Sequence, residues 1–115
     1  MTDRKFVDAI FSELFENNFV QYKNSLTKPV NGETDPYARA RSSLALLSDD
    51  QKMDVVNFLR VVIADTASVL LGTLDGVHFP DNFEGEIQVT FNGEEIQGDL
   101  QDMFIERAQE DGVYN

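Results

Sequence analysis

The chain has 115 residues, of which 42% are hydrophobic, and this length and composition indicate one folded domain over residues 1–115. Its formal net charge is −12, which disfavours nucleic acid and anionic membranes as partners because like charges repel. It contains no cysteine, which excludes disulfide frameworks, thiol catalysis and cysteine-ligated metal sites.

The sequence predicts a cytosolic protein that does not associate with membranes. Its N-terminus lacks the apolar stretch of a secretory signal. The longest apolar run, Val61 to Ala64, ends at Asp65 and is far shorter than the roughly 20 residues of a membrane-spanning helix.

The negative charge is concentrated in the last third of the chain. Residues 75–115 have a formal net charge of −10, whereas residues 1–74 have −2. Such a surface attracts basic proteins, although acidic surfaces also serve simply to keep a protein soluble. The candidate contacts to a basic partner are Glu84, Glu86, Glu94, Glu95, Asp99 and Asp102.

The first predicted helix begins at Thr2 or Asp3 and extends to about Tyr22. Its apolar residues recur at spacings of three and four, which defines one broad face. This pattern favours burial in a core over the binding of a ligand or a partner helix. The residues of the face are Phe6, Val7, Ile10, Phe11, Leu14, Phe15 and Phe19.

A loop and a short helix follow. Lys28-Pro29 and Asn31-Gly32 are turn signals within residues 24–35. Asp35 is then a suitable N-cap and Pro36 a suitable first helical residue, so we expect a helix that runs to about Leu47.

A long apolar helix is predicted next. Ser48 and Gln51 fit a capping box at its start, and Gly72 or Gly76 would end it. Between residues 53 and 71 the helix is apolar on almost all sides, which is typical of a helix that is central or covered by another subunit. A homodimer that forms through residues 53–71 is therefore one expectation.

The C-terminal segment changes to an alternating pattern. Residues 86–91 alternate polar and apolar side chains, and Asn92-Gly93 is a strong hairpin signal. A two-residue turn there places Val89 and Ile96 on the same face, and Asp99 can cap a last helix. These patterns predict an α+β fold that is mostly helical, with about four helices, a C-terminal β-hairpin around Asn92-Gly93 and a short last helix.

Few residues in this chain are suited to catalysis. His78 is the single histidine and lies between apolar neighbours, which favours a structural role. The carboxylate pairs Glu84/Glu86 and Asp50/Asp54 are expected to be solvated, and the spacing of known metal motifs is missing. We therefore predict no catalytic residue, no metal site and no cofactor, and expect a protein that is not an enzyme.

Two hypotheses for the function remain. The first is a non-enzymatic protein–protein interaction module that inhibits a basic partner, similar in size and charge to bacterial immunity proteins and antitoxins. The alternative is a small ligand-binding or enzymatic domain with a pocket between the first helix and the hairpin, for which Tyr37, Arg39, Arg41 and His78 are the candidate residues. Arg39 and Arg41 are also candidates for ion pairs with the acidic third of the chain.

Overall fold

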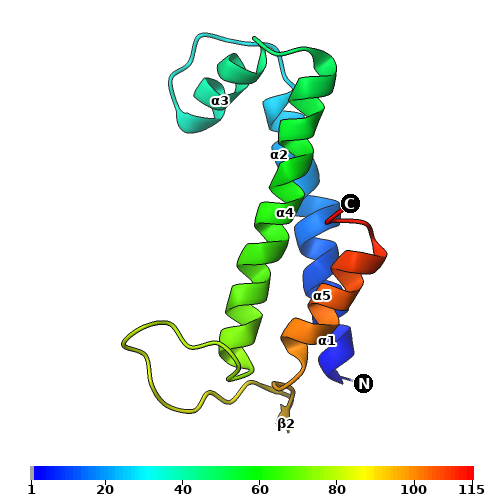
Figure 1. The fold of residues 1–115 in the computed structure, drawn as a ribbon, viewed down its shortest axis with the longest axis vertical. Helices are drawn as coiled ribbons and strands as arrows, with labels where there is room; N and C mark the ends of the chain where they lie inside the picture. The colour runs from blue at the N-terminus through cyan, green and yellow to red at the C-terminus, as the bar shows by residue number, and fades with distance from the viewer. Residues whose placement is uncertain (1) are drawn as a thin grey trace.

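The computed structural model describes residues 2–115, and the N-terminal part of the chain is one continuous helical rod (Figure 1). The rod comprises α1 (Thr2–Ser12), a π-helical segment η1 (Glu13–Asn18) and α2 (Phe19–Leu26). The predicted apolar face is confirmed, because Val7, Phe11, Phe15 and Phe19 are buried.

The two predicted helix starts in the middle of the chain are confirmed by their caps. The Asp35 carboxylate accepts a hydrogen bond from the backbone N–H of Ala38 (3.1 Å) at the start of α3 (Pro36–Leu44). At the start of α4 (Asp49–Leu74), the Ser48 hydroxyl accepts from the Gln51 backbone N–H (3.2 Å). The Gln51 side chain accepts in return from the Ser48 N–H (3.1 Å).

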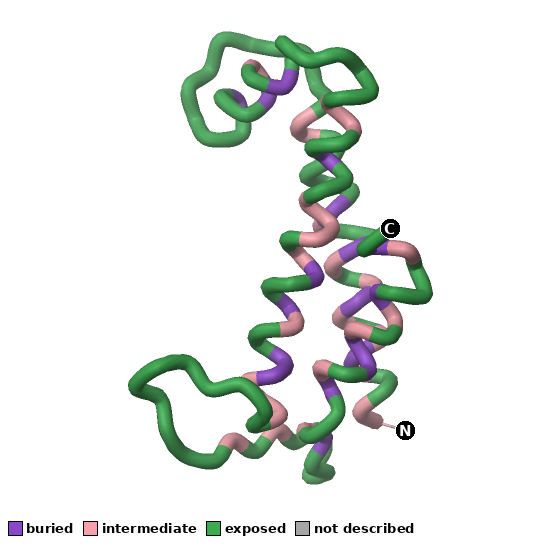
Figure 2. Tube along the Cα trace, viewed as in Figure 1, coloured by how far each residue is buried: buried purple, intermediate pink, exposed green. Residues whose placement is uncertain are grey.

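α4 is 26 residues long and only partly covered by the rest of the chain. Its buried residues are Val56, Ala64, Ala67, Leu71 and Gly72, and buried and exposed positions alternate along its length (Figure 2). Within residues 2–115, α4 is also the helix whose length and apolar character would suffice to cross a membrane, a test that core helices of soluble proteins pass too.

The predicted β-hairpin is confirmed but is shorter than the alternating pattern indicates. β1 (Thr90–Phe91) pairs with β2 (Glu94–Glu95) in antiparallel register, with Phe91 opposite Glu94. Asn92 and Gly93 have positive φ angles of 52° and 82°, as a tight two-residue turn requires. The backbone N–H of Ile96 extends the ladder by donating to the Val89 carbonyl (2.9 Å).

The last helix, α5 (Leu100–Glu110), packs against both α1 and α4. The ring of Phe104 is fully buried and lies 5.6 Å from Phe11 and 6.4 Å from Phe15, measured between ring centroids. On the α4 side, Gly72 allows close approach, because a Cβ at this position would lie 2.6 Å from the Gln101 side chain. Together, the rod, α4 and α5 enclose the main core.

A second, smaller core lies toward the other end of the long axis, where α3 packs on α2. It comprises Phe19, Leu44 and Val56. The Arg60 guanidinium strengthens the contact between α4 and the rod, since it lies 5.9 Å from the Phe15 ring centroid and 5.8 Å from that of Phe19.

The cap of α5 corrects the sequence-based prediction. Asp99 occupies the N-cap position but makes no side-chain capping bond. The capping carboxylate instead belongs to Asp75, at the end of α4. It accepts backbone hydrogen bonds from Gly98 (2.6 Å), Leu100 (3.1 Å) and Gln101 (2.8 Å). Asp75 therefore joins the hairpin and α5 to the end of α4, and its charge suits the positive end of the α5 dipole.

We expect Asp75→Ala to lower the free energy of unfolding by about 2 kcal/mol, because it leaves three backbone N–H groups without their acceptor. Urea denaturation followed by circular dichroism measures the change. The matched control is Asp99→Ala, which removes an acid from the apparent cap position and should change stability by less than about 0.5 kcal/mol. Equal losses in the two variants would contradict this role of Asp75.

Candidate functional site

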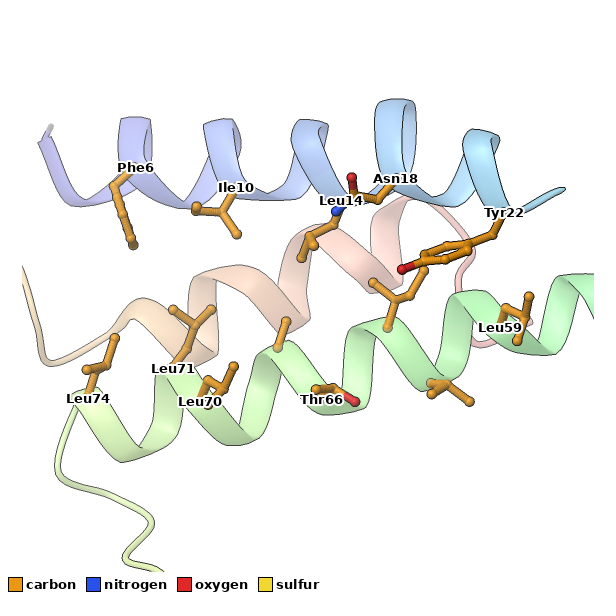
Figure 3. A pocket seen from close by; sticks show the side chains of 13 residues that line it. Phe6, Ile10, Leu14, Asn18, Tyr22, Leu59, Thr66, Leu70, Leu71 and Leu74 are labelled. Atoms are coloured by element: carbon orange, nitrogen blue, oxygen red, sulfur yellow. The ribbon is translucent and has the colours of Figure 1, made fainter. Parts of the chain in front are cut away.

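An open groove of about 610 Å³ lies between the N-terminal rod and α4 (Figure 3). α5 packs against both α1 and α4, and Figure 3 shows it behind the groove, between the rod and α4. Its lining residues are almost all apolar: Phe6, Ile10, Leu14, Asn18, Tyr22, Leu59, Val62, Ile63, Thr66, Ala67, Leu70, Leu71 and Leu74.

The rod contributes five lining residues at a constant spacing of four, from Phe6 to Tyr22. In a regular α-helix, each step of four residues rotates the side chain by about 40° beyond a full turn, so the row would drift around the helix. The π-helical segment η1 holds more residues per turn and cancels part of this drift. Phe6, Ile10, Leu14 and Tyr22 consequently all point toward the groove (Figure 3).

α4 carries an exposed apolar stripe that continues the groove outward. Val62 and Leu70 belong to the groove wall and are nevertheless exposed, Leu70 to 62%. Val55 and Val69 are about half exposed and lie on the same side of the helix as Val62, whereas the exposed Phe58 lies on another side, beside the C-terminal residues. An exposed apolar surface of this kind marks an interaction site more often than a free surface.

The groove contains no charged side chain. Its polar groups are the Asn18 amide, the Thr66 hydroxyl and the Tyr22 hydroxyl. Nothing in this lining can hold a metal ion, and within residues 2–115 no group of three His, Asp or Glu side chains is arranged to do so. The groove is therefore suited to covering apolar surface rather than to acid–base or nucleophilic chemistry.

The six candidate partner contacts lie at the end of the molecule that holds the hairpin (Figure 1). All six side chains are exposed. Glu84 and Glu86 lie in the segment between α4 and β1, Glu94 and Glu95 form β2, and Asp99 and Asp102 lie at the start of α5.

Exposed aromatic residues accompany these acids. Phe79, Phe83 and Phe91 are each about half exposed and belong to the same segment and hairpin. The Thr2 hydroxyl donates to the Glu94 carboxylate (2.6 Å), which links the hairpin to the start of the rod. This end of the molecule therefore combines negative charge with apolar anchors.

The four residues of the ligand-binding hypothesis do not converge. Tyr37, Arg39 and Arg41 belong to α3, whereas His78 follows α4 at the opposite end of the long axis (Figure 1). The observed groove also differs from the predicted pocket, because it lies between the rod and α4 and the hairpin contributes no residue to it. None of these four residues lines it.

Arg41 has a structural contact that the sequence analysis missed. Its side chain is 8% exposed. Nε donates to the Ser25 carbonyl (2.7 Å) and Nη2 to the Ser25 hydroxyl (3.2 Å), which joins α3 to α2. The predicted ion pairs of Arg39 and Arg41 with the acidic third of the same chain do not form, since both salt bridges within residues 2–115 involve Arg107; pairing with the acidic third of a neighbouring copy stays a prediction. Tyr37 stacks on Tyr22 with ring centroids 6.4 Å apart.

Two displaced pKa values occur outside the groove. Burial raises the pKa of Tyr114, and so does the bond from its hydroxyl to the Asp65 carboxylate (3.1 Å). The backbone N–H of Ala38 lowers the pKa of Asp35, as expected for a helix cap. Both shifts are explained by local structural contacts.

No protein-family model matches this chain, and comparison with curated proteins and with solved structures gives no significant match.

We expect Arg41→Ala to lower the free energy of unfolding by about 2 kcal/mol, because it removes two hydrogen bonds and leaves the Ser25 carbonyl without its donor. Arg39→Ala is the matched control: Arg39 lies two residues away on the same helix and is exposed, so its loss should cost less than about 0.5 kcal/mol. Urea denaturation distinguishes the variants, and a greater loss from Arg39→Ala would refute the assignment.

Proposed function

We propose that this chain is a cytosolic, non-enzymatic protein–protein interaction module that binds a basic protein through its acidic hairpin end, as immunity proteins and antitoxins do. The observation that supports this proposal is the gathering of six exposed acids and three exposed phenylalanines at one end of the molecule.

The two kinds of residue have different physical roles in such a complex. Exposed carboxylates attract a basic surface over a distance of about a Debye length, which speeds association and selects against acidic partners. Phe79, Phe83 and Phe91 supply the apolar area that slows dissociation once the surfaces meet. A solubilising surface alone would not place aromatic side chains among its charges.

We propose a protein without enzymatic activity because few side chains of this chain are chemically reactive. The chain has one histidine and no cysteine. His78 is exposed and does not line the groove, and the groove itself carries no ionisable group other than the Tyr22 hydroxyl. A catalytic site needs a positioned acid, base or nucleophile beside the substrate.

The test is a pull-down from the host lysate with the tagged wild-type protein and a variant in which Glu84, Glu86, Glu94 and Glu95 are all changed to lysine. We expect the wild type to retain a basic protein at low salt and release it at high salt, and the variant to retain at least tenfold less. The reason is that the variant replaces attraction by repulsion at the contact surface.

The matched control reverses four exposed acids elsewhere on the molecule, namely Glu16, Glu33, Glu106 and Glu110, and so changes the net charge equally. It should retain the partner about as well as the wild type. Equal loss in both variants would show that only the total charge matters, and retention by the hairpin variant would refute the proposal.

A further inference from the structure

The chain by itself is less compact than a monomer of its size. Its radius of gyration is 17.3 Å, whereas a folded domain of 115 residues has about 13 Å. Its accessible surface is 7771 Å², about 1,400 Å² more than the roughly 6,300 Å² usual for a monomer of 13.0 kDa. A stable dimer covers about 800 Å² on each partner, so the excess is large enough for such an interface.

Part of the exposed apolar surface belongs to α4, where Val55, Val62, Val69 and Leu70 are exposed. The exposed side of α4 has the seven-residue repeat of a helix-pairing seam. Val55, Val62 and Val69 form one row, and Leu59, Thr66 and Thr73 form the next. Neither row contains a charged residue, although the chain has 21 acids and 9 bases. α5 packs on another side of α4, and of the seam Leu59 packs against the second core, whereas Val55, Val62, Thr66 and Val69 remain exposed in the single chain.

We propose that a second copy of this chain covers the groove, with the two α4 helices packed antiparallel about a two-fold axis near Thr66. The groove and the seam lie side by side on one molecule. Each subunit can therefore contribute the same surface to the interface, as two-fold symmetry requires. An interface without charged residues has the apolar composition of a protein core. This composition is typical of permanent homodimers rather than of transient complexes.

The antiparallel direction follows from the charge distribution. A parallel arrangement would bring together two hairpin ends, each carrying the net −10 of residues 75–115. In the antiparallel arrangement, the ends of the two α4 helices that lead into these segments are separated by about 25 Å. This exceeds the Debye length of about 8 Å at physiological salt. Antiparallel helices also align their dipoles favourably.

The axis position follows from the groove. Along α4, the lining runs from Leu59 to Leu74, and its midpoint is at Thr66, whose side chain is exposed. About this axis, Val62 lies opposite Leu70 of the partner subunit. The Thr66 hydroxyl meets Thr66 of the partner subunit, with which it can form a hydrogen bond. The rods then cover the flanks, and the pair forms a four-helix layer of two rods and two α4 helices.

This interface is separate from the acidic end of the proposed function, so either proposal can fail alone. The first test is the mass in solution at about 10 µM, measured by light scattering after size exclusion. We expect about 26 kDa, twice the 13.0 kDa of one chain. A mass of 13.0 kDa would overturn the proposal. If that monomer bound phosphatidylcholine vesicles, the groove would cover a lipid surface instead, and the dimer would still be refuted.

A variant then locates the interface. Leu70→Glu should give a monomer with unchanged helical circular dichroism, because Leu70 is 62% exposed in the single chain and its loss leaves the core intact. The matched control, Leu46→Glu, changes the same residue type at a position that is 87% exposed but lies outside the groove, and it should remain a dimer. A dimer that survives Leu70→Glu would overturn the proposal.

Single cysteines test the direction and the axis, because the natural chain has none. Thr66→Cys should form a disulfide dimer under mild oxidation, because the two sulfur atoms would meet near the axis. Thr73→Cys lies seven residues along the same seam, so its sulfur would be about 21 Å from its counterpart and should not cross-link. Cross-linking of both variants, or of Thr73→Cys alone, would overturn the antiparallel arrangement about Thr66.

Discussion

The architecture depends on the packing of α5 between α1 and α4. Phe104 is fully buried against the rings of Phe11 and Phe15, and the Asp75 carboxylate holds the first turn of α5 at the end of α4. α5 contacts both long helices, so this single short element joins them in one core. α5 covers one side of the pair formed by the rod and α4. No other helix within residues 2–115 covers the opposite side, which is the open apolar groove.

The groove and the acidic end differ in the physical interaction that each can provide. The groove has no charged side chain and can gain free energy mainly by removing apolar surface from water. The hairpin end has six exposed acids, and its long-range attraction acts before contact. This separation of apolar and charged surface is compatible with both proposals, a permanent interface at the groove and a salt-sensitive interface at the hairpin end.

Much of the local structure could be predicted because its determinants lie within a few residues. The Asp35 cap, the Ser48–Gln51 capping box and the Asn92-Gly93 turn each involve neighbouring residues, and all three occur in the structure. The cap of α5 could not be found in this way. Asp99 fits the local rule, but Asp75, which lies 25 residues before Leu100, accepts the hydrogen bond from the Leu100 N–H instead.

The amino-acid sequence determined the helices, the hairpin, the apolar face of the rod and the placement of charge in the last third, because these depend on local periodicity and composition. Only the tertiary structure decided which apolar side of α4 is covered, that Arg41 bonds to Ser25 rather than to an acid, and that Tyr37 and His78 lie at opposite ends. The physical reason is that α4 is apolar on almost every side from Val61 onward. When several faces of a helix are equally apolar, the sequence periodicity does not identify the face that is buried. The shapes of the helices that pack against α4 determine which face it is.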